Sequence, residues 1–454
     1  MKPSIFSRLI RLVGFLSAAS IALSASAASR SAGFAPAALP NPLDLKSAVS
    51  YALDHSYSIR LARETIREQE GLIVEVKARI LPQIAATASY TRKDDSLVQG
   101  PVGADQNWMI LLQARQSIYA GGGVRAAIDA QGLVREASLQ NLKSTINDAL
   151  LDVRTKFFNI LLARDQIKVQ EENTALLTEQ LRNVTNRYQA GTVSKFDVLQ
   201  AEVQLANAQP TLITARNTYR TSIDQLRQSL GAPVSLTDDS SKTLDVAGTL
   251  EFAPVKYDLK DALESARANR PELLALSKTE QANQRNIRLQ QSGYFPSVDL
   301  VGGYEWIKNS KSNRLRDSLD GWLVGAEASW AIFDGRATAG KVMQARSQYE
   351  KARLNTEFQT LSIDVEVRQA YSSLQEADEL VQATLKTAGQ ARESLRLATA
   401  RFNAGTATQL DVLTSQVALS QARLNELQAN YNYNVALATL RKAIGQGDVY
   451  APVN

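Results

Sequence analysis

Cysteine is absent from this chain of 454 residues, and His55 is its only histidine. Without cysteine the protein forms no disulfide, offers no thiolate to a metal and has no site for a lipid thioether. The sequence also lacks a metal-ligand cluster and a Gly-x-Ser-x-Gly motif, and its glycine-rich turn, YAGGGVRAA, lacks the Lys-Ser/Thr of a phosphate-binding loop. We therefore predict that the protein is not an enzyme and that it binds no cofactor or metal.

Long hydrophobic runs are missing beyond the first thirty residues. At the N-terminus, three basic residues precede an apolar run that ends in Ala25-Ser26-Ala27, the pattern of a signal-peptidase site. We predict an export signal at 1–27, followed by a linker at 28–43. Because the signal holds three basic and no acidic residues, its removal lowers the net charge from +5 to +2, so the charge favours no nucleic-acid partner. No later segment approaches the ~20 apolar residues of a membrane helix, so any membrane-spanning part has to consist of strands.

The chain is a tandem duplication with an offset of 214 residues. The phrase RYQAGTVSKFDVL at 187 returns as RFNAGTATQLDVL at 401, and DLKSAVSYA at 44 returns as DLKDALESA at 258. The offset holds through both units without a net insertion, which indicates an internal pseudo-dimer. The predicted organisation is repeat 1 at 44–231, an equatorial connector at 232–257, repeat 2 at 258–445 and a C-terminal tail at 446–454.

Each repeat contains two segments that alternate between apolar and polar residues. In the last of them, Trp322, Val324 and Ala326 share one face, and Glu327 lies on the other. This alternation over about ten residues, with aromatic residues near the ends, is typical of outer-membrane barrel strands, although one such hairpin also fits a soluble core. Four strands cannot close a barrel, and open edges in lipid leave backbone groups unpaired, so a barrel requires subunits that share strands. The predicted strands are about 83–95, 107–119, 296–309 and 321–333, and the predicted membrane-interface aromatics are Tyr90, Trp108, Tyr304, Trp306, Trp322 and Trp330.

Long helices account for most of the remaining sequence. Proline-free segments at about 124–188 and 338–402 each reach roughly 95 Å at the helical rise per residue. The returning segments carry heptad repeats with small residues at one seam position, which predicts coiled-coil packing. A second, offset seam in repeat 2 predicts a neighbour on each side of the returning helix, as in a cylinder of helices. Pro210 lies inside the first returning segment, where we expect it to kink the helix.

The duplicated phrase falls where each long helix turns into its returning helix. Each copy has a glycine suited to the left-handed conformation that ends a helix, followed by the Ser/Thr-x-x-Asp spacing of a capping box. The phrase therefore predicts a tight turn at each hairpin tip. A carboxylate at the end of a tube also forms a ring of charge when subunits repeat around an axis. The residues are Gly191, Ser194 and Asp197 at a first tip of about 188–197, and Gly405, Thr408 and Asp411 at a second tip of about 402–411.

These features resemble the TolC family of outer-membrane efflux proteins. The resemblance rests on the duplication, the paired hairpins, SIYAGGG and AIFDGRA after the second strand of each repeat, and the two Gly-Thr…Asp-Val-Leu turns, and it covers about Asp44 to Gly445. It implies an α+β membrane protein, a homotrimer whose tandem-duplicated protomers share a 12-stranded barrel in the outer membrane of a Gram-negative bacterium. Long coiled-coil helices then form a trimeric α-barrel across the periplasm. The implied function is a passive exit duct for efflux of small molecules or type I protein secretion, opened by a periplasmic adaptor bound to an inner-membrane transporter.

The resemblance also implies roles at the hairpin tips. Asp197 matches an aspartate in the family's closing bonds, Asp411 matches a lumen-facing selectivity aspartate, and Phe402 stands where a gate tyrosine is found. Ala407 replaces a gate arginine and Thr414 replaces a second ring aspartate, so we expect a weaker carboxylate ring in place of the family's salt-bridge lock. The residues expected to contact the adaptor are Arg187, Gly191, Thr192, Arg401, Gly405 and Thr406.

A soluble periplasmic coiled-coil scaffold or adaptor is the alternative function. Adaptors carry one helical hairpin, a lipoyl-like β domain and an inner-membrane anchor, whereas this sequence predicts two hairpins, four strands and no anchor. The sequence names neither the exported cargo nor the energy source of the partner pump, proton or ATP.

Overall fold

The computed structural model describes residues 39–94, 106–233, 244–308 and 318–448. The described helices and strands all belong to one compact unit that begins at Asn41. The predicted signal at 1–27 and most of the linker lie outside the described residues, as do parts of the connector and the tail.

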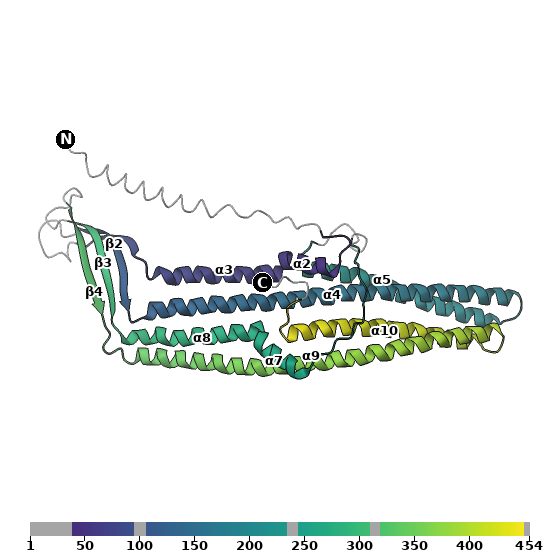
Figure 1. The fold of residues 1–454 in the computed structure, drawn as a ribbon. Helices are drawn as coiled ribbons and strands as arrows, with labels where there is room; N and C mark the ends of the chain where they lie inside the picture. Colours follow the sequence, from purple (N-terminus) through teal and green to yellow (C-terminus); the bar gives the residue numbers. More distant parts are fainter. Residues whose placement is uncertain (1–38, 95–105, 234–243, 309–317, 449–454) are drawn as a thin grey trace. The chain divides into compact units, whose positions relative to one another are not determined.

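Four strands form one antiparallel sheet in the order β1-β2-β3-β4 (Figure 1). Repeat 1 supplies β1 (Gln83–Arg92) and β2 (Gln106–Ala120), and repeat 2 supplies β3 (Ser297–Ile307) and β4 (Leu319–Ser329). Because β2 pairs with β3, the two repeats build one continuous sheet. Within the described residues, β1 and β4 are its edges.

The last strand ends earlier than its sequence pattern predicts. The alternation predicts Trp330 on this strand, but Trp330 lies one residue beyond β4. Its indole Nε1 donates to the carbonyl oxygen of Tyr294 (3.1 Å), so the chain has left the strand ladder at this point. The prediction was wrong because the apolar alternation continues through Ile332, whereas the hydrogen-bonded pairing does not.

The register gives the sheet an aromatic face and a polar face, since directly opposite residues point to the same side. Tyr304 lies opposite both Trp322 on β4 and Leu112 on β2, and Tyr90 lies opposite Trp108. The aromatic face therefore carries Tyr90, Trp108, Tyr304, Trp306 and Trp322.

The polar face carries a charged cluster that spans three strands. Arg115 on β2 forms ion pairs with Glu327 on β4 and with Asp299 on β3, the latter between Nη1 and Oδ2 at 3.9 Å. All three side chains lie on the side opposite the aromatic residues, as the alternation predicts, although Asp320, opposite Trp306, is a charged residue on the aromatic face.

Four helices continue the four strands in the same order. α3 (Tyr57–Ala78) leads into β1, β2 leads into α4 (Gly123–Gln189), α8 (Pro271–Gln291) leads into β3, and β4 leads into α9 (Ala337–Asn403). α3 packs against α4, α4 against α8, and α8 against α9 (Figure 1). The four helices thus form a single row that extends from one end of the sheet. None of the helices in the described ranges combines the length and the apolar character that a membrane span needs.

The returning helices complete two long hairpins. α5 (Lys195–Leu230) packs against α4, and α10 (Gln409–Ala443) packs against both α9 and α4 (Figure 1). The two seams in the sequence of α10 are explained by these two neighbours. α5 continues as one helix across Pro210.

The early helical segment of each repeat is broken at the same position. α2 (Leu45–His55) is separated from α3 by Ser56, and α7 (Leu259–Asn269) is separated from α8 by Arg270. Only the break in repeat 2 is followed by a proline, Pro271. Gly231 at the end of α5 and Gly445 after α10 pack against these breaks in the left-handed conformation, with φ of 74° and 73°. A Cβ on Gly445 would lie 2.9 Å from the carbonyl carbon of Asn269, so the close approach requires glycine.

The connector after residue 244 is attached to α10 through Tyr433, a fully buried aromatic residue. Its hydroxyl donates to the carbonyl of Ala253 (2.8 Å) and accepts from the amide of Val255 (3.0 Å). The ring of Phe252 packs edge-on against it, with ring centres 4.8 Å apart. This contact places the connector over the middle of the helical part.

Candidate functional site: the hairpin tips and the central polar network

Both long helices end in the same hydrogen-bonded turn. At the end of α4, the amide of Gly191 donates to the carbonyl of Tyr188 and the amide of Thr192 donates to that of Arg187, both at 2.9 Å. This is the Schellman pattern, and it requires the left-handed φ of 72° at Gly191. The hydroxyl of Thr192 also donates to the Arg187 carbonyl (2.9 Å), which explains why threonine follows glycine. The second tip repeats the arrangement with Arg401, Phe402, Gly405 and Thr406.

Both returning helices begin with a capping box, as the sequence predicts. Asp197 accepts from the amide (2.9 Å) and the hydroxyl (2.7 Å) of Ser194, and its own amide donates to the Ser194 hydroxyl (3.3 Å). Thr408 and Asp411 make the same three contacts at 2.8, 2.8 and 3.3 Å. The two carboxylates therefore fix the start of each returning helix.

The charge of Asp411 is stabilised locally. The amide and hydroxyl of Thr408, and then the positive charge of Arg401, hold the pKa of the Asp411 carboxyl below its ordinary value. In the described part of the chain, neither Asp197 nor Asp411 forms an ion pair. Their carboxylates are therefore available to give the tips a negative charge.

Arg187 and Phe402 connect the two tips. The guanidinium carbon of Arg187, at the end of α4, lies 4.5 Å from the centre of the Phe402 ring, at the end of α9. This is the geometry of a cation–π contact, and it joins the hairpin of repeat 1 to that of repeat 2. A tyrosine hydroxyl is not needed for it. Of the predicted tip residues, these two are brought together, whereas Gly191, Thr192, Gly405 and Thr406 are exposed.

Below the tips the hairpins pack through α10. Leu413 of α10 lies in a buried cluster with Leu177 of α4 and Ala208 of α5. The Gln416 amide donates to Asn173 on α4 (3.3 Å), and Arg423 forms an ion pair with Glu172. Movement of one tip relative to the other would have to disrupt these contacts.

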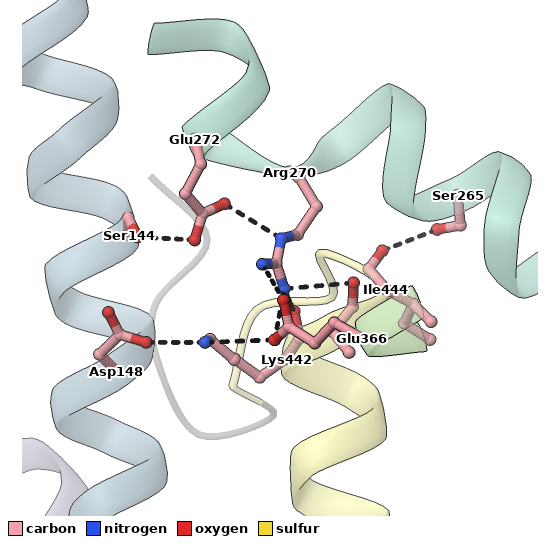
Figure 2. A network of polar contacts seen from close by, with 9 residues as sticks. Ser144, Asp148, Ser265, Arg270, Glu272, Glu366, Lys442 and Ile444 are labelled. Atoms are coloured by element: carbon pink, nitrogen blue, oxygen red, sulfur yellow. Dashed lines mark hydrogen bonds and ion pairs between the residues drawn. The ribbon is translucent and has the colours of Figure 1, made fainter. Parts of the chain in front are cut away.

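A polar network that sequence reasoning missed joins the middle of the two repeats (Figure 2). Arg270, whose side chain is only 4% exposed, pairs with Glu366 of α9 (2.6 Å) and Glu272 of α8 (3.1 Å). It also donates to the last carbonyls of α10, at Lys442 (3.5 Å) and Ala443 (3.4 Å). One buried guanidinium therefore connects three helices of repeat 2.

The network extends to α4 of repeat 1. Lys442 pairs with Asp148 of α4 (2.9 Å) and with Glu366 (3.6 Å), and Ser144 of α4 donates to Glu272 (2.7 Å) (Figure 2). Burial raises the pKa of Glu366, but the hydrogen bonds and charge of Arg270, with the charge of Lys442, more than offset this and keep the pKa below its ordinary value. Glu366 thus remains ionised at neutral pH within the protein.

Comparison with known proteins decides the family. The profile of the outer membrane efflux proteins matches twice, at residues 48–232 and 262–446, once for each repeat. The chain belongs to this family. The TolC-family resemblance is therefore confirmed, and so is the fold class of four strands joined to long helical hairpins.

Individual relatives agree with this assignment. The chain is 27% identical over 384 residues to the outer membrane protein TolC of Vibrio cholerae, covering 82% of this chain and 84% of the relative. It is 25% identical over 416 residues to the cobalt-zinc-cadmium resistance protein CzcC of Cupriavidus metallidurans, covering 90% and 92%. The crystal structure of the CmeC outer membrane channel of Campylobacter jejuni superposes with a TM-score of 0.76 at 17% identity, covering 89% and 87%. The protein is thus an outer-membrane exit duct for efflux or secretion, as the resemblance predicts.

Proposed function

We propose that three copies of this outer-membrane efflux protein form one duct, in which β1 of each protomer pairs with β4 of the next. The observation that supports this is the sheet itself, in which the described residues leave β1 and β4 as edges and form an aromatic face of five residues. Edges that face lipid would leave backbone groups unpaired at several kcal/mol each. Twelve strands from three protomers remove every edge, and the matching row of four helices per protomer continues the duct into the periplasm.

We further propose that the hairpin tips are the closed end of the duct and the site at which a periplasmic adaptor acts. Arg187 and Phe402 hold the two tips of a protomer together, and Asp197 and Asp411 supply a ring of carboxylates. The exposed residues at the turns, Gly191, Thr192, Arg401, Gly405 and Thr406, are the contact surface for the adaptor. An inner-membrane transporter bound to the adaptor provides the energy, and the duct opens when the tips separate.

A crosslinking experiment tests whether separation of the tips is required for export. The chain has no cysteine, so Arg187→Cys combined with Phe402→Cys provides two reactive thiols and no others. A cleavable bis-maleimide that joins them should stop dye export from cells that contain the adaptor and transporter. Cleavage of the linker should restore export.

A matched pair of cysteines within one hairpin provides the control. Arg187→Cys combined with Phe196→Cys joins α4 to α5 and leaves the two hairpins free to move apart. Its crosslinking should leave export unchanged. Undiminished export with fully crosslinked Arg187→Cys/Phe402→Cys protein would show that the tips do not gate the duct.

The number of subunits requires a separate measurement. Native mass spectrometry of the protein extracted from outer membranes should show three copies of the chain. A soluble monomer recovered from the periplasm would instead support a coiled-coil scaffold, the alternative function considered for the sequence.

A further inference from the structure

A cavity of about 580 Å³ lies where the sheet meets the row of helices. Arg125 and Asp129 of α4 line it on one side, and Arg285 and Arg288 of α8 line it on the other, with Phe295 at the end nearest β3. Among the described residues, none of these three guanidinium groups has a hydrogen-bond or ion-pair partner. Three guanidinium groups and one carboxylate therefore give the cavity an excess of positive charge.

The cavity is positioned just below an apolar belt. Each of the four junctions between a helix and a strand carries two adjacent large apolar residues that are at least 45% exposed. Such a belt marks the boundary between hydrocarbon and water in a protein of this family. The pairs are Ile80 and Leu81, Ile118 and Tyr119, Tyr294 and Phe295, and Ile332 and Phe333.

The cavity opens on the side of the protomer that carries the aromatic face. Trp108 on β2 lies on this face, and its carbonyl accepts a hydrogen bond from the amide of Lys308 (3.0 Å), the residue opposite it just beyond the end of β3. The β2 residues of the aromatic face therefore direct their backbone N–H and C=O groups toward β3. The chirality of L residues fixes the side on which these backbone groups lie once the viewpoint and the strand direction are chosen. When the aromatic face is turned toward the viewer and the helices point downward, β3 lies to the left of β2. In α4, Gln131 contacts α3 and Gly123 faces α8. Because the helix is right-handed with about 100° per residue, these two contacts place Arg125 on the same side of the protomer as the aromatic face.

The helices that form the cavity are the two inner helices of the row. α4 and α8 each have a neighbour of the same protomer on both sides, whereas α3 and α9 are at the ends. A subunit that pairs at β1 or β4 would lie beside the end helices. The cavity therefore remains open to the surroundings in an assembled duct.

We propose that this cavity binds the headgroup of an anionic phospholipid from the leaflet nearest the helices. Arginine matches the geometry of a phosphodiester, and basic pockets at the edge of the hydrocarbon region are suited to acidic lipid headgroups. The exposed ring of Phe295, at the membrane end of the cavity, lies where the first acyl carbons of such a lipid would be. A free phosphate would use the arginines but not this apolar contact.

Native mass spectrometry tests the proposal on the full-length protein in nanodiscs of phosphatidylethanolamine with or without phosphatidylglycerol. The wild-type protein should retain phosphatidylglycerol through stepwise delipidation. Arg285→Gln combined with Arg288→Gln should lower its retention about thirtyfold. The control variant Arg182→Gln/Arg392→Gln removes the same charge from two exposed arginines on α4 and α9 and should behave as wild type.

A second variant acts in the opposite direction and keeps all three arginines. Asp129→Asn removes the one carboxylate of the cavity and should raise retention about fivefold, an effect that impaired folding would not produce. Equal retention by Arg285→Gln/Arg288→Gln and the control would overturn the proposal. Displacement of the lipid by millimolar inorganic phosphate would also overturn it, because the cavity would then be a site for a free anion.

Discussion

Replacement of Arg270 by methionine should destabilise the protein more than the loss of any exposed ion pair. Methionine keeps an unbranched apolar stem but removes the guanidinium that pairs with Glu366 and Glu272 (Figure 2). Loss of one partner of a buried pair costs about 3–5 kcal/mol because the other charge stays buried. Glu366 is 37% exposed and keeps Lys442 at 3.6 Å, so we expect a smaller loss of about 2–3 kcal/mol.

Chemical unfolding followed by circular dichroism measures this loss. Arg216→Met is the matched control, since Arg216 of α5 pairs with Glu171 of α4 at 2.7 Å and both side chains are about half exposed. Its unfolding midpoint should change little, because water screens that pair. Equal shifts for Arg270→Met and Arg216→Met would refute the reasoning from burial.

The effect should also depend on pH in a defined direction. The pKa of Glu366 in the folded protein lies below its ordinary value, so the pairing stabilises the protein above that ordinary value, about 4.3. This stabilisation is lost as the pH falls through the lower folded pKa. The difference in stability between wild type and Arg270→Met should therefore be complete at pH 7 and shrink below about pH 4. A difference that stays constant to pH 3 would mean that Glu366 does not carry it.

Three further changes test the tips and the sheet. Gly405→Trp should leave the assembly intact in native mass spectrometry, because no atom lies within 4 Å of the position that a Cβ on residue 405 would take. The variant should nevertheless abolish export, because it alters the turn. Loss of assembly would contradict this prediction. Asp411→Asn should lower the cation preference of single channels in planar bilayers. Since the pKa of Asp411 is depressed, the cation preference of the wild-type channel should persist at pH 4. An unchanged cation preference in the variant would exclude Asp411 from the conduction path. Arg115→Gln should raise cation preference, because Asp299 and Glu327 lose their shared cation; an unchanged reversal potential would place the polar face away from the lumen.

The architecture was largely predictable because local sequence patterns determine it and each pattern occurs in both repeats. Alternation marked the four strands, absence of proline marked the long helices, and the glycine and Ser/Thr-x-x-Asp of each tip specified both turns. The pairing of β2 with β3 across the repeats could not be predicted, since no turn connects these strands. The break at Ser56 was missed because repeat 1 has no proline there, although Arg270-Pro271 lies at the 214-residue offset.

The contacts at the candidate sites were less predictable than the residues themselves. Arg187 and Phe402 were identified separately from the tip sequences, but their contact joins helices of different repeats and leaves no local pattern. The network around Arg270 has the same character, because its members come from α4, α8, α9 and α10. Only the three-dimensional packing shows that a charged residue at a helix break is buried.

The two repeats share the same arrangement of helices and strands, but the polar side chains at equivalent positions differ. At the repeat offset Arg270 corresponds to Ser56, whose hydroxyl contacts that of Ser58 at 3.0 Å. Ser56 thus supplies no guanidinium at the break in repeat 1, whereas Arg270 connects the break in repeat 2 to α9 and α10, and through Glu272 and Lys442 to α4. The bases of the two hairpins are therefore held by different interactions, although their tips are capped identically. A separation of the tips would therefore act against different restraints at the two bases, and at the base of the repeat 2 hairpin the Arg270 network supplies them.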